Sequence, residues 1–158
     1  MKAPRITWQV LEEIGQNEYE YGIYKNYNEE DSLIPGRTLK KTIRVWNNYL
    51  GTEDIQDVNN AILVLGFKTY EDNFLLNLIQ VSIDGSELKE LDIDMNGGTV
   101  FFGNLSGETN NGKEANHTNY KTIDIEIGPI PDNIKSELKS LYFYLEYKVE
   151  EESEDDFE

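Results

Sequence analysis

The sequence predicts an all-β chain folded as an antiparallel β-sandwich with short helical turns. Two observations support this prediction. Several segments alternate apolar and polar residues with a period of two, the pattern of a strand that buries one face. Turn-forming pairs such as Pro35-Gly36 and Asp84-Gly85 separate these segments at fairly regular intervals. Many short strands punctuated in this way are typical of sandwiches and barrels.

The 158 residues are expected to form one domain followed by a short tail, because single cores of about 100–150 residues are the commonest size. Residues 1–149 form the predicted sandwich, in which residues 1–38 are an N-terminal extension or added strands. Seven of the nine residues in 150–158 are acidic. Their charges repel one another, so this segment is expected to be a flexible tail.

Three strands are predicted in the first third of the chain, at residues 5–11, 18–25 and 39–49. The side chains that share one face in these three segments are Ile6, Trp8 and Val10, then Tyr19, Tyr21 and Ile23, then Ile43 and Val45. Successive side chains on a strand point to opposite faces, so each set is expected to lie on a single side of its strand.

The middle of the chain carries two segments, 61–70 and 74–83, that are apolar on both faces. This pattern is typical of central or covered strands. Asp72-Asn73 between them suits a tight turn, because short polar side chains tolerate left-handed backbone. Residues 100–103 are a predicted short strand.

The last two predicted strands have the clearest alternation. Ile123, Ile125 and Ile127 alternate with polar residues in 121–128. In 140–149, Leu141, Phe143, Leu145, Tyr147 and Val149 lie on one face, and Tyr142 and Tyr144 lie on the other. The first set is expected in the core and the tyrosine pair on the outside.

Non-strand structure is expected in three places. Residues 54–60 and 133–138 each suit one helical turn, with Asp132 as the N-cap of the second. Residues 104–119 are rich in Gly, Asn and Thr, which indicates an exposed loop.

The charge and composition exclude several classes of partner. A net charge of −17 repels nucleic acid and anionic membranes, both of which are polyanions. The chain has no Cys, and therefore no disulfide, thiolate metal site or cysteine nucleophile. No secretion signal is visible, so synthesis and folding are expected in the cytoplasm.

No catalytic motif stands out. The single histidine, His117, lies in the polar 104–119 loop with no orienting partner beside it. The sequence contains neither a nucleophile elbow nor a phosphate loop nor a dinucleotide fingerprint. We interpret the chain as not an enzyme and expect no cofactor other than a calcium ion.

The calcium hypothesis rests on Asp92, Asp94 and Asn96. With Gly97 they match the first half of a calcium loop, in which three oxygen ligands alternate along the chain. The twelfth position is Gly103, where that loop requires a bidentate Glu. The alternative is a hairpin turn with Asn96-Gly97 at its tip.

Exposed aromatic residues indicate a contact surface. Tyr142 and Tyr144, together with Tyr19 and Tyr21, are the candidate interface residues. An apolar patch on a highly charged protein marks a site of association, with copies of the chain or with other proteins as partners. The alternatives are that these aromatics stack on surface carbohydrate or fill the core.

The segment TIRVWNN at 42–48, followed by DVNNA at 57–61 and two long apolar strands, resembles immunoglobulin-like modules of tailed-bacteriophage virion proteins and of bacterial adhesion proteins. The resemblance covers residues 40–85 and implies an immunoglobulin-like sandwich; a jelly-roll-like sandwich is the other form expected. Together with the missing secretion signal, it implies a virion component assembled in the host cytoplasm with other virion proteins, as a capsid decoration, neck, tail or baseplate accessory. The alternative is a carbohydrate- or calcium-binding module involved in cell-surface adhesion.

Overall fold

The structure is a computed structural model. It describes residues 2–10, 16–19, 23–24, 32–33, 36–49, 51–67, 70–95, 97–108, 118–133, 137–138 and 141–148. The predicted acidic tail at 150–158 and His117 lie outside these residues. Among the described residues, no helix is long and apolar enough to cross a membrane.

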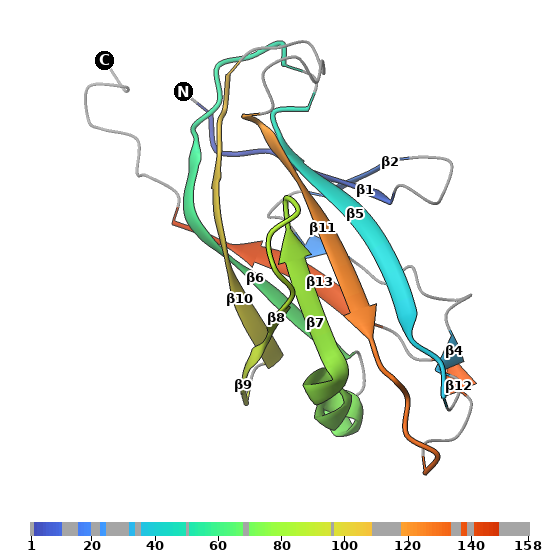
Figure 1. Cartoon of the computed structure of the whole chain (residues 1–158). Helices are drawn as coiled ribbons and strands as arrows, with labels where there is room; N and C mark the ends of the chain where they lie inside the picture. The colour runs from blue at the N-terminus through green and yellow to red at the C-terminus, as the bar shows by residue number, and fades with distance from the viewer. Residues whose placement is uncertain are drawn as a thin grey trace.

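Two antiparallel sheets pack together, which confirms the predicted all-β sandwich (Figure 1). The first sheet has the strand order β2-β1-β5-β11-β7-β8. Its bounds are β1 (Ile6–Val10), β2 (Gln16–Tyr19), β5 (Leu39–Asn47), β7 (Ile79–Ile83), β8 (Lys89–Glu90) and β11 (Tyr120–Ile127). Its longest pairing joins the central strands β5 and β11 over eight residue pairs, and β11 pairs with β7 over five.

The second sheet has the order β3-β13-β6-β10-β9. Its bounds are β3 (Ile23–Tyr24), β6 (Val58–Phe67), β9 (Asp92–Asp94), β10 (Gly97–Leu105) and β13 (Leu141–Glu146). A separate pair joins β4 (Ser32–Leu33) to β12 (Glu137–Leu138). A 3-10 helix, η2 (Tyr70–Leu78), connects β6 to β7 at the lower end of the molecule in Figure 1.

The core lies between the sheets and is formed by inward-facing side chains of β1, β5, β6, β7, β10, β11 and β13, with Leu75 and Leu76 of η2. Trp8 of β1 packs on Phe143 of β13, with ring centroids 4.9 Å apart, so this aromatic contact joins the two sheets. Ile43, Leu63 and Phe143 have no exposed surface. Burying each such side chain contributes about 1.5–3 kcal/mol. The inward positions predicted for residues 39–49, 121–128 and 140–149 are confirmed where the structure describes them.

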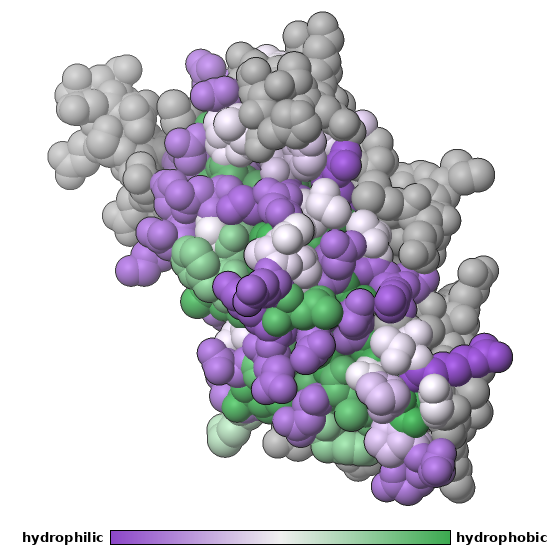
Figure 2. All heavy atoms as spheres, viewed as in Figure 1, coloured by the Kyte–Doolittle hydropathy of each residue, from purple (hydrophilic) through white to green (hydrophobic). Residues whose placement is uncertain are grey.

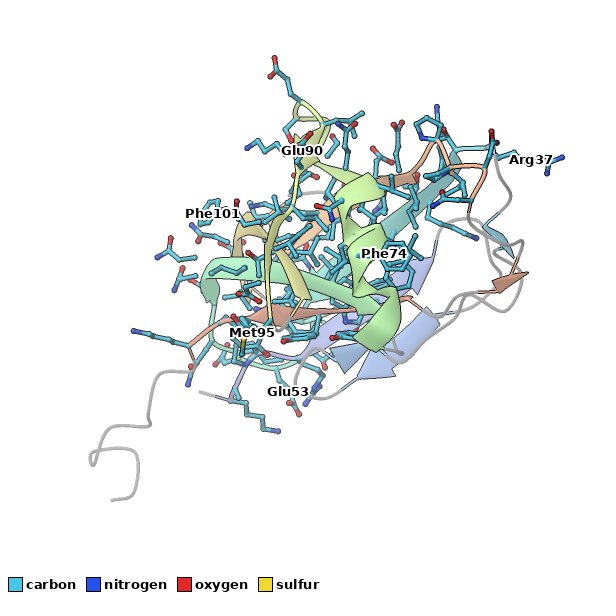
Figure 3. The ribbon with its side chains drawn as sticks, turned by 90° about the horizontal axis from the view of Figure 1, so that it is seen from below. Arg37, Glu53, Phe74, Glu90, Met95 and Phe101 are labelled. Atoms are coloured by element: carbon cyan, nitrogen blue, oxygen red, sulfur yellow. The ribbon has the colours of Figure 1, made fainter. Side chains whose placement is uncertain are left out.

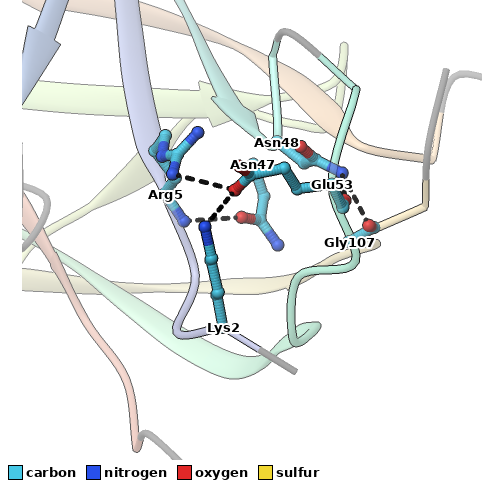
Figure 4. Close-up of polar contacts among 6 residues, drawn as sticks. All are labelled: Lys2, Arg5, Asn47, Asn48, Glu53 and Gly107. Atoms are coloured by element: carbon cyan, nitrogen blue, oxygen red, sulfur yellow. Dashed lines mark hydrogen bonds and ion pairs between the residues drawn. The ribbon is translucent and has the colours of Figure 1, made fainter. Parts of the chain in front are cut away.

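Buried asparagines fasten the loops at one end of the sandwich (Figure 4). Asn47 ends β5, and its side-chain oxygen accepts the Arg5 backbone N–H at 3.0 Å. Asn48 follows with a φ of 56°, a conformation that asparagine tolerates better than most residues. Its side-chain amide donates to the carbonyls of Gly107 at 2.8 Å and Glu53 at 3.0 Å. The two asparagines therefore connect neighbouring loops through buried hydrogen bonds.

Three local predictions are wrong. Residues 74–78 belong to η2 and not to a strand, and Asp72-Asn73 lies inside this helix. Leu75 and Leu76 are buried side by side while Phe74 is exposed, and a short apolar run does not by itself separate helix from strand. Residues 54–60 form no helical turn, because β6 begins at Val58.

Three further predictions differ from the structure in their bounds or their type of structure. Residues 18–25 are not one strand: 16–19 form β2 of the first sheet and 23–24 form β3 of the second. The short strand expected at 100–103 is the middle of β10, which runs over nine residues. Of the predicted turn at 133–138, residues 134–136 lie outside the described residues and 137–138 form β12.

Candidate functional site

The outer face of the second sheet carries aligned rows of side chains. Strand register places Tyr144, Val64, Thr99 and Asp92 opposite one another across β13, β6, β10 and β9. The next row is Glu146, Ile62 and Phe101. The row on the other side begins with Tyr142 beside Gly66 and includes Asp94. We call these residues the outer face: Ile62, Val64, Gly66, Asp92, Asp94, Thr99, Phe101, Tyr142, Tyr144 and Glu146.

The apolar part of the outer face is open to solvent at one end. Phe101 is 61% exposed and its cross-strand neighbour Ile62 is 37% exposed. Phe101 projects outward from the body of the molecule in Figure 3. Val64, in the adjoining row with Tyr144, is only 2% exposed. Solvent exposure on this face therefore increases from Val64, which is covered, to Phe101, which is open to solvent.

We call Ile62, Val64 and Phe101 the apolar strip. A tyrosine pair lies at the end of this strip that is away from Phe101. The rings of Tyr142 and Tyr144 are 6.3 Å apart between centroids and nearly parallel, at 10°. Tyr142 reaches across β6: a Cβ atom added at Gly66 would lie 2.5 Å from Cζ of Tyr142. A glycine within a strand often permits such a close approach. Both tyrosines lie on the face opposite the core, as the alternation of 140–149 predicts.

Carboxylates lie on both sides of the tyrosine pair. Asp92 and Asp94 are exposed on the edge strand β9, and Glu146 is exposed at the end of β13. Partial burial raises the pKa of Tyr144 above its usual value, and the charges of Glu146, ionised Tyr142 and Asp94 raise it further. Carboxylates on β13 and on the edge strand β9, which lie on the same face, therefore act on one tyrosine, and this part of the outer face is acidic.

The calcium candidates lie on this same face. Asp92 and Asp94 alternate on β9, and Asn96 lies outside the described residues. β9 and β10 form a hairpin, as the alternative hypothesis predicts, but Gly97 pairs with Asp94 as the first residue of β10 and is not part of the tip. Within the described part of the chain, no three His, Asp or Glu side chains come together as a metal site. Calcium binding stays a prediction.

One of the other two interface candidates lies in the first sheet, away from the outer face. Tyr19 is the last residue of β2 in the first sheet, and Tyr21 lies outside the described residues. Sequence reasoning missed Phe101 and Ile62. Residues 100–102 are apolar without alternation, so only the register with β6 shows which of the side chains points outward.

The first sheet has a polar depression of about 290 Å³ on its own outer side. Both of its carboxylates have partners. Thr42 Oγ1 donates to Asp124 Oδ1 at 2.7 Å, and Lys40 Nζ lies 3.6 Å from Glu126 Oε1. Figure 2 shows hydrophilic side chains over much of the visible surface, with apolar areas between them.

Comparison with known proteins gives a limited result. No family model matches the chain, and no curated protein does. Among solved structures, AvmM, described as catalysing macrocyclization in alchivemycin A biosynthesis, is similar at a TM-score of 0.42 and 15% identity, over 80% of this chain and 74% of that one. A family 123 glycoside hydrolase from Clostridium perfringens is similar at 0.37 and 18% identity, over 76% of this chain and 19% of that one.

One interpretation from the sequence needs correction. Both similar structures are described as enzymes, which contradicts the interpretation that this chain is not an enzyme. We therefore withdraw that exclusion. At these TM-scores and identities the likeness transfers neither reaction, nor the role of any residue, to this chain. Neither description mentions a virion protein, so the phage resemblance stays a prediction.

Proposed function

We propose that this chain is an interaction module that attaches to a partner protein, within a larger assembly, through the outer face of its second sheet. The exposure of Phe101 beside Ile62 is the observation that carries this proposal. Large apolar side chains gathered on one face of a charged protein mark contact surfaces, and aromatic residues are enriched in protein interfaces.

A tailed-bacteriophage particle is the assembly that we propose. The resemblance of residues 40–85 to immunoglobulin-like virion modules suggests this setting, with other virion proteins as partners. The sandwich architecture agrees with such a module, although many unrelated functions use the same architecture. The site itself therefore has to be tested.

Photocrosslinking at Phe101 tests the site directly. A benzophenone amino acid replaces Phe101 in one variant and Phe74 in a matched control. Phe74 is similarly exposed, at 58%, but lies on η2 and not on the outer face. In cells that naturally make the chain, position 101 is expected to give one dominant crosslinked product, identified by mass spectrometry as an assembly protein.

The crosslinked partner then has to bind in a purified system. Phe101→Ser is expected to weaken this binding at least tenfold, since central aromatic contacts contribute about 2 kcal/mol or more, while Phe74→Ser leaves it unchanged. Equal crosslinking from both positions, or none from position 101, would show that the outer face is not the contact surface.

Surface carbohydrate is the second candidate ligand, and the parallel tyrosine pair favours it. Two rings at 10° on one face offer stacking surfaces for the apolar faces of sugar rings, and Asp92 and Asp94 would accept hydrogen bonds from hydroxyl groups. A glycan array reports on this directly. A hit that Tyr142→Ala and Tyr144→Ala abolish, in variants that remain folded, would support a carbohydrate ligand over a protein partner.

A further inference from the structure

We infer that the partner presents arginine side chains to the tyrosine pair, between the carboxylates of β9 and that of Glu146. This inference rests on the proposed function and specifies the chemistry of the partner. It concerns a basic protein surface that covers both the apolar strip and the tyrosine pair.

The arrangement of charge supports a cationic occupant. Asp92 and Asp94 on β9 lie on one side of Tyr144, and Glu146 lies two residues beyond it on β13. The described part of β13 and the two residues after it carry one basic side chain, Lys148, at the far end beyond Glu146. A partner cation above Tyr144 therefore meets acidic groups from two directions, and complementary potentials of this kind favour the correct partner.

The same charge disfavours a second copy of this chain as the occupant. Two copies packed face to face would bring Asp92, Asp94 and Glu146 of each against the same groups of the other. Like charges brought together at an interface cost binding energy, and the whole chain carries a net charge of −17. A heterologous basic partner removes this repulsion.

Arginine fits the tyrosine pair better than lysine does. The guanidinium group is planar, stacks on aromatic rings and binds carboxylates with two parallel hydrogen bonds. Nearly parallel rings on a flat sheet suit such stacking. The chain already uses this contact elsewhere, because the Arg44 guanidinium lies 4.5 Å from the centroid of the Tyr120 ring.

A peptide titration followed by NMR tests the inference. The probe is a short peptide that repeats arginine-glycine-valine-glycine, so that arginine and valine share one face when it is extended. Backbone amide shifts are expected to change on β13, β6 and β9, and not on β7 or β8. Replacing arginine with lysine is expected to weaken binding severalfold, and replacing it with glutamate to abolish binding.

Charge-neutralising variants separate a local effect from overall charge. Asp94→Asn with Glu146→Gln is expected to weaken binding of the arginine peptide about fivefold. The matched control, Glu87→Gln with Glu90→Gln, removes the same charge from exposed positions near β7 and β8 of the first sheet, and is expected to leave binding unchanged. Equal weakening by the two double variants would overturn the inference.

The outcomes distinguish this inference from the proposed function. Position-101 crosslinking to a partner, combined with no shifts on the outer face from the arginine peptide, rejects the arginine chemistry and leaves the interaction module intact. If the purified chain forms a dimer at neutral pH and Phe101→Ser dissociates it, the arginine chemistry is likewise rejected and the interaction module is kept. Loss of the position-101 crosslink rejects the proposed function itself.

Discussion

Gly66 and Tyr142 share a space that holds only one side chain. The Tyr142 ring occupies the place where a Cβ of Gly66 would lie. We predict that Gly66→Ala destabilises the protein by about 1–3 kcal/mol, the usual cost of overpacking. In a Tyr142→Ala background the same change should be neutral or stabilising, because glycine in a strand costs about 0.5–1 kcal/mol relative to alanine. Urea unfolding of the parent, the two single variants and the double variant measures this reversal, and additive effects would contradict it.

Asn48 combines a left-handed backbone with a buried amide that holds two loops. Asn48→Gly keeps the backbone accessible but leaves the Gly107 and Glu53 carbonyls without this donor, which costs about 1–3 kcal/mol. Asn48→Ala also places a Cβ in the left-handed region and should cost about 1 kcal/mol more. Thermal unfolding compares the two variants. A less stable Gly variant would show that the backbone conformation is unimportant here.

Tyr144 reports on the potential of the outer face through its ionisation. Its pKa in the folded protein is raised above 10.0, so the folded state holds the phenolic proton more tightly than the unfolded state. The resulting stability is present below pH 10 and is lost as the pH rises through the folded pKa. We predict that Glu146→Gln lowers this pKa. Ultraviolet titration at alkaline pH, with Tyr144→Phe to assign the signal, measures it; an unchanged pKa would exclude Glu146 as a cause.

At the scale of elements, η2 closes one end of the core with Leu75 and Leu76. These residues are 1% and 0% exposed, whereas Phe74 between β6 and β7 is 58% exposed. We predict that Leu76→Ala costs about 2–5 kcal/mol and that Phe74→Ala stays within about 0.5 kcal/mol of the parent. Chemical denaturation measures both. Similar losses for the two variants would mean that Phe74 also supports the core.

Alternation predicted the elements that bury one face, whereas the two apolar runs located β6 and β7 but did not reveal η2 between them. β5, β11 and β13 have regular apolar periodicity, so their positions and inward residues followed from the sequence. Residues 74–78 are apolar in a run, and neither strand nor helix periodicity distinguishes them. For the candidate site, Tyr142 and Tyr144 followed from the alternation of β13. Phe101 required the register of β10 with β6, a non-local pairing that no short segment specifies.

At the scale of the whole molecule, the sequence also did not show to which of the two sheets each strand belongs. β2 and β3 are separated by few residues yet belong to different sheets, and β1 pairs with β5 on the side away from β2. Such choices depend on which distant strand each segment meets. The net charge of −17 was evident from composition, and its consequence for association follows once the apolar strip is located.

With a net charge of −17, copies of this chain are expected to repel one another at neutral pH, which disfavours contact between their apolar strips. Near the isoelectric point of about 4.3 this repulsion vanishes, and proteins without net charge associate more readily. We predict that light scattering shows association of the purified chain as the pH falls toward this value. Phe101→Ser should reduce the association, and Phe74→Ser should reduce it less, because Phe101 adjoins Ile62 on the outer face. If the two substitutions act equally, association at low pH uses the general surface and the outer face holds no special place in it.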